Sequence, residues 1–264
     1  MALFKGEWSA EFWRYRELFF FLVWRDVKIR YKQTALGAAW AIIQPFMTMI
    51  IFTLFFGKMA KMPSDGIPYP IFAYSALLPW TYFSVSLGLS GNSLVTNARL
   101  IQKVYFPRVA IPASSALSGL VDFFIASIVL LGMMFYYDIP LSFGLLLWPV
   151  LLIPLVFLVL GVGMILSALN VKYRDIKYAI PFFIQSWLFI TPIIYPTSII
   201  PERFRPLINL NPLTGLIEAF RASLLPTRSV DWGSVLISVG ITSIIFIFGT
   251  LYFKKTERAF ADII

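Results

Sequence analysis

The side chains that most often carry out chemistry are scarce in this sequence. It contains no Cys and no His, which excludes thiolate nucleophiles, histidine general bases and the usual transition-metal sites. The phosphate-binding pattern G-x-x-x-x-G-K-[ST] is also absent, so the chain does not hydrolyse ATP by the usual route. A lipid-processing enzyme would need paired carboxylates or a metal cluster, and the sequence shows neither. Catalysis is therefore the weakest of the functional classes that we consider.

One charged side chain stands out because of what surrounds it. Asp122 is the only charged residue in the apolar stretch 109–137. A carboxylate inside a membrane span serves either a proton or ion relay or a bond to a neighbouring helix. A relay needs several such groups, so we favour a structural bond over a relay.

The composition defines the class of protein that must position these residues. Of the 264 residues, 59% are hydrophobic and 13% are charged, and the mean hydropathy is +0.81. Such a chain cannot cover itself with polar surface as soluble domains do. The sequence predicts an all-α integral membrane protein forming one transmembrane domain over residues 1–264, and no nucleic-acid partner despite the net charge of +9.

Long uncharged stretches predict the membrane spans, because a helix needs roughly 20 apolar residues to cross the hydrocarbon core. The second stretch contains Pro70 and Pro79 and follows Pro68, so we expect its helix to be broken or kinked. The six predicted spans are 36–56, 69–90, 109–137, 143–169, 178–196 and 234–253.

Two further segments are predicted to be amphipathic helices. In 7–31, apolar residues recur every three or four positions between charges, which predicts a helix lying flat on the cytoplasmic membrane face, with an ordinary soluble helix as the alternative. In 199–231, charges interrupt apolar runs too short to cross alone, and Pro212 and Pro226 bound a helical stripe. This external segment lies on the far surface or dips in and returns.

The distribution of basic residues predicts the orientation. The segments 1–32, 97–108, 170–178 and 254–264 hold 16 of the 22 Lys and Arg residues. Because cytoplasmic loops carry the excess of basic residues, these segments and both termini are predicted to be cytoplasmic.

The segment 97–108 reads as a short helix between two spans. Asn97 can cap it and Pro107 can end it. One face is apolar and the other basic, which suits a groove on a cytoplasmic partner, although a solvated surface turn would look similar. The residues assigned to this contact are Arg99, Leu100, Ile101, Lys103, Val104 and Tyr105.

Five motifs, in this order, resemble the membrane subunit of type-2 ABC exporters for cell-surface polysaccharides. They are RDVKIRYKQTALG (25–37) running into Trp40 and Gln44, NARLIQKVYFP (97–107), NVKYRDI (170–176), TPIIYP (191–196) and NLNPLTG (209–215). The resemblance covers nearly the whole chain. Within that family the O-antigen permeases are most similar, with teichoic-acid and capsule permeases close behind.

The resemblance implies a homodimer of six-helix subunits in the bacterial inner membrane, paired with two ATPase subunits. ATP and Mg²⁺ would bind to those partners, with no cofactor in this chain, and a lipid-linked polysaccharide would move outward through a channel at the dimer interface. It further implies that 97–107 is the coupling helix, that the N-terminal helix is the interface helix and that 207–225 shapes the exit. The interface and gate positions are Arg25, Arg30, Tyr31, Leu36 and Gly37.

A glycan path should be aromatic and polar with few charges, because sugar C–H faces stack on rings and hydroxyls exchange bonds with amides. Spans one, two and five supply this mixture, although any single member is more often a packing or interfacial residue. The alternative is a type-2 ABC permease for a small lipophilic compound. The candidate path residues are Trp40, Gln44, Phe52, Tyr74, Trp80, Tyr82, Gln185, Trp187 and Tyr195.

Overall fold

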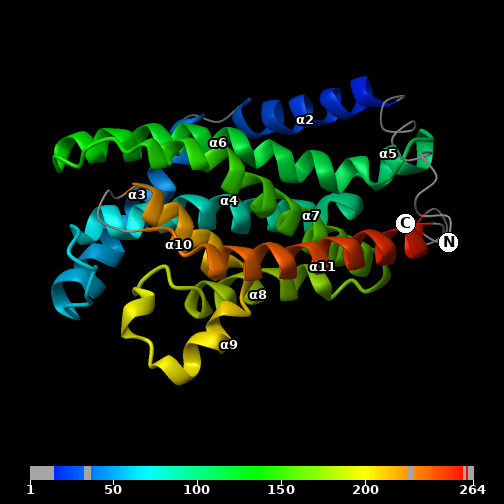
Figure 1. Ribbon diagram of the computed structural model, residues 1–264. Coiled ribbons are helices and arrows are strands. Elements are labelled where there is room, and N and C mark those ends of the chain that lie inside the picture. The colour runs from blue at the N-terminus through cyan, green and yellow to red at the C-terminus, as the bar shows by residue number, and fades with distance from the viewer. Residues whose placement is uncertain (1–14, 33–36, 225–228, 258–259, 261–264) are drawn as a thin grey trace.

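The computed structural model describes residues 15–32, 37–224, 229–257 and 260, and every regular element within these ranges is a helix (Figure 1). Long helices run side by side between two ends of a bundle. The short helix α5 and the end of α11 lie at one end, and the ends of α3 and α6 lie at the other. The chain therefore passes back and forth along one axis.

Four helices in the described residues are long and apolar enough to cross a membrane. They are α3 with its continuation η1 (Ala39–Met59), α6 (Ala110–Tyr136), η2 with α7 (Phe143–Lys172) and α11 (Trp232–Glu257). Each coincides with a predicted span to within a few residues. Asp231 begins α11 by accepting hydrogen bonds from the Gly233 N–H at 3.0 Å and the Ser234 hydroxyl at 2.6 Å.

Helix α4 (Tyr69–Thr96) runs through the middle of the bundle as one uninterrupted helix. Pro79 lies inside it without ending it, and Pro68 and Pro70 flank its start, where the missing N–H would have no helical partner anyway. The structure therefore shows no break here, and of the two predicted alternatives only a kink stays a prediction. Most of its side chains are buried against other helices, which explains why α4 is less apolar than the four helices above.

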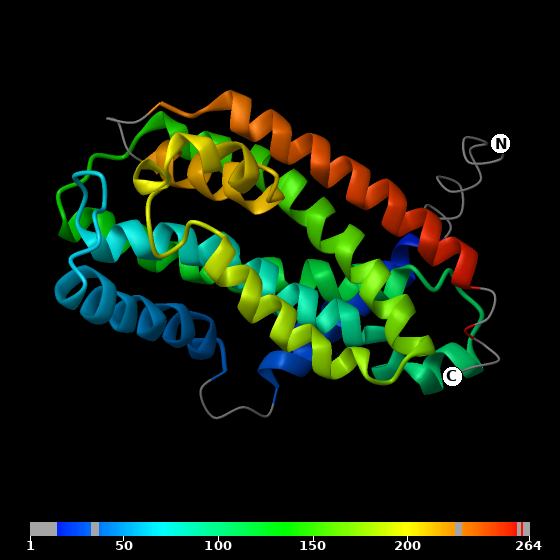
Figure 2. The ribbon, with the colours of Figure 1, turned by 90° about the horizontal axis from the view of Figure 1, so that it is seen from below.

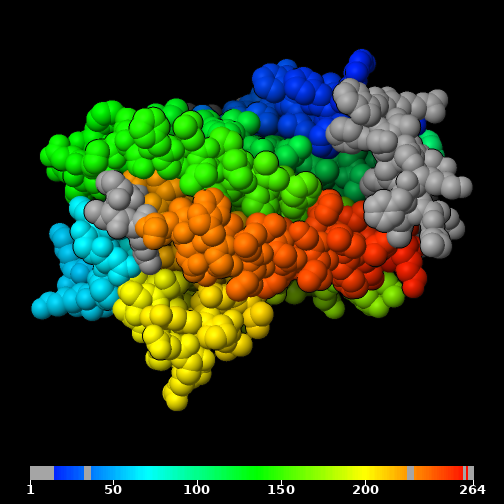
Figure 3. Space-filling view, in the orientation of Figure 1, coloured from blue at the N-terminus to red at the C-terminus, as the bar shows by residue number. Residues whose placement is uncertain are grey.

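Helix α8 (Ile176–Ile190) is shorter than the predicted fifth span and ends six residues before Pro196. Only Ile180 is buried, while Phe182 and Phe189 are 74% and 58% exposed. After it the chain turns through 191–196 into the short elements η3 (Thr197–Ile199), η4 (Glu202–Phe204) and α9 (Arg205–Asn209). The space-filling view shows this segment, in yellow, projecting from the side of the bundle (Figure 3).

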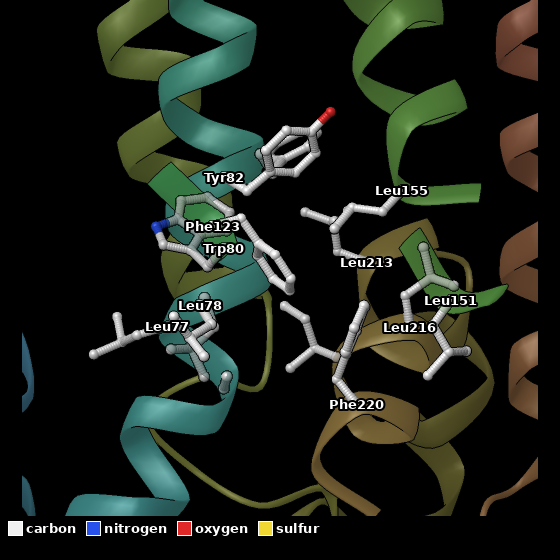
Figure 4. Close-up of a cluster of buried hydrophobic side chains, with 14 of the residues drawn as sticks. Leu77, Leu78, Trp80, Tyr82, Phe123, Leu151, Leu155, Leu213, Leu216 and Phe220 are labelled. Carbon is white, nitrogen blue, oxygen red and sulfur yellow. The ribbon is translucent and has the colours of Figure 1, made fainter. Parts of the chain in front are cut away.

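Helix α10 (Pro212–Leu224) confirms the predicted apolar stripe in the segment after α8. Leu213, Leu216 and Phe220 are fully buried and point toward α4 and α7 in the central core (Figure 4). From α4 come Leu77, Leu78, Trp80 and Tyr82, and from α6 comes Phe123. The helix is thus enclosed by the bundle rather than laid over its outside.

Small residues let α7 and α11 approach closely. A Cβ atom added at Gly249 would lie 2.4 Å from the carbonyl oxygen of Gly161, and one at Gly161 would lie 2.8 Å from the Cα of Phe246. Backbone contact of this kind replaces the hydrophobic driving force that is missing between helices in lipid. The pair α7–α11 is therefore a tightly packed part of the scaffold.

Helix α2 (Arg16–Tyr31) lies lengthwise beside the first half of α6 (Figure 1). The predicted inward stripe is confirmed in its described part, since Leu22 and Val27 are buried. Phe20, Phe21 and Trp24, however, are more than half exposed on the opposite side. The sequence predicted a helix lying flat on the cytoplasmic membrane face; in the structure, polar groups along α6, described below, hold α2 lengthwise beside that helix.

Helix α5 (Ala98–Lys103) is shorter than predicted and ends four residues before Pro107. Asn97 does not cap it through its side chain; the amide instead donates to the Ser93 carbonyl of α4 at 2.8 Å. The following loop is tied to the end of α11, where the Arg108 N–H donates to the Glu257 carboxylate at 3.0 Å. These bonds fix the predicted coupling segment to two long helices.

Candidate functional site: a polar and aromatic face on α3, α4 and α8

A cavity of about 240 Å³ lies where α2, α3, α4 and α6 meet. We call it the carboxylate cavity, because the Asp122 side chain forms part of its wall. It brings together six residues that were predicted from the sequence as path or gate positions. They are Arg30, Tyr31, Gly37, Trp40, Gln44 and Tyr82.

Asp122 joins α6 to α2. Its carboxylate accepts a hydrogen bond from the Arg30 guanidinium and another from the Tyr31 hydroxyl, and Arg30 also donates to Ser118 at 3.3 Å. The preference for a structural bond over a relay thus matches the observed contacts.

A second carboxylate connects the same two helices, and it lies on α2 one helical turn before Arg30. Asp26 accepts hydrogen bonds from the hydroxyls of Ser114 and Ser115 at 3.1 and 3.2 Å, and its own neighbour Arg25 donates to it at 2.8 Å. Arg25 therefore supports the α2–α6 contact rather than lining the cavity. Leu36 lies outside the described residues, and Gly37, two residues before the start of α3 at Ala39, has a φ of +48°, a conformation that favours glycine.

Helix α3 carries the most exposed members of the predicted path. Trp40 is 54% exposed and Gln44 is also exposed, one helical turn further along the same wall. Four residues of spacing place both side chains on one face. An indole and an amide thus stand together at the mouth of the carboxylate cavity.

A wider groove of about 640 Å³ separates α4 from α8, and we call it the α4–α8 groove. Trp80 and Gln185 face it from the two sides. Val85 lines both this groove and the carboxylate cavity, so the two hollows lie on adjoining sides of α4. Together they form a face of the molecule running from α3 across α4 to α8 (Figure 2).

The strip of α4 within this face is polar although the helix carries no charge. Thr81, Ser84, Gly88 and Asn92 follow one another at spacings of three and four residues. Asn92 is held by its neighbours, since its amide donates to the Gly88 carbonyl at 2.8 Å and its oxygen accepts from Asn170 at 3.0 Å. This strip was not predicted from the sequence, where the only indication of it is the helical spacing of small and polar residues.

The other predicted path residues lie in packing positions. Tyr74 is fully buried and donates to the Ala126 carbonyl at 3.2 Å, and Phe52 packs edge to face on Phe56. Tyr82 lines the cavity with a ring that is 2% exposed, and Trp80 is 4% exposed. Tyr195 donates to the last carbonyls of α8, at 3.2 Å to that of Phe189.

Trp187 belongs to a network that closes the turn after α8. Its indole N–H donates to the Asn211 side-chain oxygen at 2.9 Å, and the Asn211 amide donates to the Thr191 hydroxyl at 2.9 Å. The ring also packs edge to face on Phe83 and Phe183. These bonds therefore join two of the five sequence motifs, 191–196 and 209–215.

Arg221 completes that network from α10, and the sequence analysis gave it no role. It is completely buried, donates to Glu218 at 2.6 Å and to the carbonyls of Pro192 and Ile193 at 3.2 and 3.3 Å. Its guanidinium lies 3.7 Å from the centre of the Phe72 ring. A charge in a run of apolar residues was its only signal in the sequence.

The predicted coupling residues divide into two groups. Ile101 is buried and Leu100 is partly buried against α2, α7 and α11 residues of a second core cluster. Val104 and Tyr105 are 49% and 90% exposed, and Arg99 and Lys103 are exposed as well. The surface available to a partner therefore centres on Tyr105 rather than on the whole predicted apolar face.

The fold defines a multi-pass helical membrane protein, and the residues that α3, α4 and α8 contribute to this face are polar, aromatic or apolar but not charged. Comparison with known proteins is consistent with that class. Residues 17–225 match the family model described as ABC-2 type transporter, and the chain belongs to this family.

Individual relatives cover nearly the whole chain. The chain is 28% identical over 255 residues to the O-antigen export system permease protein RfbA of Myxococcus xanthus, covering 96% of this chain and 97% of that protein. It is 31% identical to the RfbA protein of Klebsiella pneumoniae, with 91% and 92% covered. The polysialic acid transport protein KpsM of Escherichia coli is 24% identical, with 89% and 92% covered. The resemblance seen in the motifs is thereby confirmed: the chain is an ABC-2 permease homologous to polysaccharide export permeases.

Proposed function

We propose that this chain is the permease subunit of an ATP-driven exporter that moves a lipid-linked, O-antigen-like polysaccharide outward across the inner membrane. The observation that carries the proposal is the polar and aromatic face from α3 across α4 to α8, to which these three helices contribute no charged side chain and on which Trp40, Gln44 and Gln185 are exposed. Stacking rings, hydroxyls and amides suit a sugar chain. The similarity to O-antigen permeases supports the same substrate class.

The proposed architecture adds α4 and α8 to the four apolar helices as spans two and five. The turn at 191–196 with α9 and α10 is a re-entrant segment on the outer side, and both termini are cytoplasmic. Two copies of the chain face each other through the α3–α4–α8 face, so that the glycan passes between them. Lipid surrounds the remaining surfaces.

Energy comes from a separate partner in this proposal. Two ATPase subunits, which hold ATP and Mg²⁺, contact the exposed residues around Tyr105 and Lys103 at the cytoplasmic end. The bonds from Asn97 to α4 and from Arg108 to α11 carry movement of this segment into the bundle. The presence of an ATPase partner is what ABC-2 family membership implies.

Gene deletion tests the proposal. In the native host, loss of this chain should abolish one surface glycan and leave its lipid-linked form inside the cell, and a plasmid copy should restore export. If all surface glycans persist and resistance to a lipophilic compound falls instead, the alternative of a small-compound permease replaces the proposal.

Alanine substitutions should distinguish residues that line the glycan path from residues that only pack the fold. Trp40→Ala should leave the amount and thermal stability of the protein near wild type, because exposed substitutions change stability little, yet reduce glycan export. Gln44→Ala should likewise leave the stability of the protein near wild type and reduce glycan export. The matched control is Trp232→Ala, whose ring is 53% exposed at the start of α11 and away from the face. Trp40 would lie outside the path if Trp232→Ala reduced export equally, or if export in Trp40→Ala fell only in proportion to the amount of protein.

Trp80→Ala and Trp187→Ala should behave differently from Trp40→Ala. Trp80 is buried, and Trp187, although only partly buried, packs on Phe83 and Phe183 and donates to Asn211; truncating a buried Trp costs about 3–5 kcal/mol. We therefore expect these variants to lose stability first, and they are poor probes of the path.

The coupling surface should respond to Tyr105→Ala and Val104→Asp. Both side chains are exposed, so the bundle should stay folded while co-purification of the ATPase and export fall together. Phe143→Ala, at a ring that is 92% exposed at the other end, serves as the control. Normal ATPase association in both coupling variants would show that the ATPase contacts another part of the chain.

The orientation can be tested directly because the chain contains no Cys. A cysteine at Asp138 should react with a membrane-impermeant thiol reagent in intact cells, as should one at Asp65. Cysteines at Lys103, Lys172 or Lys255 should react only after lysis. External labelling at position 103 or 172 would reverse the topology. Arg228, also predicted to be external, lies outside the described residues.

A further inference from the structure

A third hollow, which the proposed path does not use, lies between α3 and α6. This α3–α6 groove holds about 600 Å³ and is lined by α3 and its continuation η1 (Thr53–Met59), the start of α4 and the last turns of α6. It lies at the bundle end opposite α5. Trp40 and Gln44 line the carboxylate cavity instead, so α3 separates two hollows of different character.

The interior of the groove is apolar and adaptable. Met49 and Met133 form buried parts of its wall, and Phe46 and Leu54 stand partly exposed at its sides. Methionine side chains are unbranched and polarisable, so they fit ligands of irregular shape. The groove is therefore suited to a flexible hydrocarbon chain.

One end of the groove carries a cation and two phenols. Lys58 is the only charged residue in its lining, is exposed and forms no ion pair among the described residues. Tyr136 and Tyr137 lie at the same end, where amphipathic rings favour the headgroup region of a bilayer. An apolar slot that opens beside an unpaired ammonium group matches a ligand with a hydrocarbon tail and an anionic head.

The backbone around the groove is also unusual. Thr53–Met59 is a π-helical segment, a rare geometry that occurs often at functional sites, and it supplies Thr53, Leu54 and Lys58 to the lining. Across the groove, a Cβ atom added at Gly132 of α6 would meet nothing within 4 Å. The wall opposite the π-helical segment is thus open rather than filled.

We propose that the α3–α6 groove binds an anionic phospholipid of the surrounding bilayer, with an acyl chain between α3 and α6 and its headgroup phosphate at Lys58. Charge complementarity selects this occupant over zwitterionic lipid, because Lys58 has no acidic partner in the described chain. The bound lipid holds the far half of α3 against α6. The proposal depends on membrane embedding and not on the identity of the exported substrate.

The test uses the full-length chain in phosphatidylcholine nanodiscs doped with a photoreactive phosphatidylglycerol. We expect crosslinks in 46–58 and 129–137. Gly132→Leu should place a side chain in the groove, since a Cβ atom there meets nothing within 4 Å, and abolish these crosslinks, while Gly240→Leu, on α11 and equally free of neighbours within 4 Å, should leave them unchanged. Lys58→Gln should lower the preference for phosphatidylglycerol over a photoreactive phosphatidylcholine by about fivefold.

Three outcomes would overturn the proposal. Equal crosslinking in Gly132→Leu would mean that the lipid lies elsewhere, and an unchanged preference in Lys58→Gln would mean that the charge selects nothing. Recovery of a polyprenyl phosphate or a second protein chain from the groove, in place of phospholipid, would assign it another occupant. Each outcome is independent of glycan export, so failure here leaves the proposed function standing.

Discussion

Asp122→Ala should loosen the contact between the end of α2 and the middle of α6 and destabilise the protein by about 2–3 kcal/mol. The substitution removes the acceptor for both Arg30 and Tyr31 and leaves a guanidinium without its carboxylate. We expect less than the roughly 3–5 kcal/mol of a fully buried pair, because the side chains of Arg30 and Asp122 remain 22% and 19% exposed. Thermal unfolding of the purified protein measures the loss, and export should fall because the carboxylate cavity loses one wall.

Two controls separate this contact from a general effect of removing a carboxylate. Asp138→Asn changes a carboxylate at a φ of +52°, which Asn tolerates, and should be neutral. The double variant Arg30→Ala/Asp122→Ala should cost clearly less than the sum of the single variants, since the two side chains share one interaction. Strict additivity would show that Asp122 and Arg30 stabilise the protein independently.

Arg221→Met should be the most destabilising single change in the segment after α8, at about 3–5 kcal/mol. Methionine keeps much of the volume but strands Glu218 and removes the donors to the Pro192 and Ile193 carbonyls. The melting temperature should fall by roughly 10 °C, and cysteines placed in the turn 191–196 should become more reactive. Arg205→Met, at a side chain that is 49% exposed, is the matched control and should change little.

A compensating variant sharpens that prediction. Glu218→Gln combined with Arg221→Met removes the stranded carboxylate and should recover part of the lost stability. A double variant as unstable as Arg221→Met alone would mean that the carbonyl contacts, rather than the ion pair, dominate the role of Arg221.

Helix positions followed from the sequence where hydrophobicity alone determines them. Uncharged runs of about 20 residues located α3, α6, α7 and α11, and helical spacing located the buried stripe of α10. Helix α4 was located too, but it is continuous rather than broken, because Pro79 is tolerated inside a helix that is enclosed by other helices.

The position of α2 could not be predicted from its own residues. Its charges suggested a surface helix, but Asp26 and Arg30 find partners in Ser114, Ser115 and Asp122, more than 80 positions along the chain. Such pairing depends on which helices become neighbours, and hydropathy carries no such information. The same limit applies to Trp187, whose indole looked free in the sequence and is bonded to Asn211.

The candidate path was partly predictable. Aromatic and amide residues in spans one, two and five suggested a shared face, and Trp40, Gln44, Trp80 and Gln185 do line adjoining hollows. Tyr74 belongs to the same set by residue type but faces the core, because a buried Tyr and a path-lining Tyr differ only in what surrounds them.

The most direct test of the proposed glycan path is photocrosslinking in living cells. A photoreactive amino acid in place of Gln44 should capture the glycan during export, giving a product recognised by an antibody to that glycan. The same amino acid at Ile244, 69% exposed on α11 and away from the face, should capture lipid only. Glycan captured at position 44 and not at 244 is the predicted result; glycan captured at 244, or at neither position while export continues, would contradict a path along α3, α4 and α8.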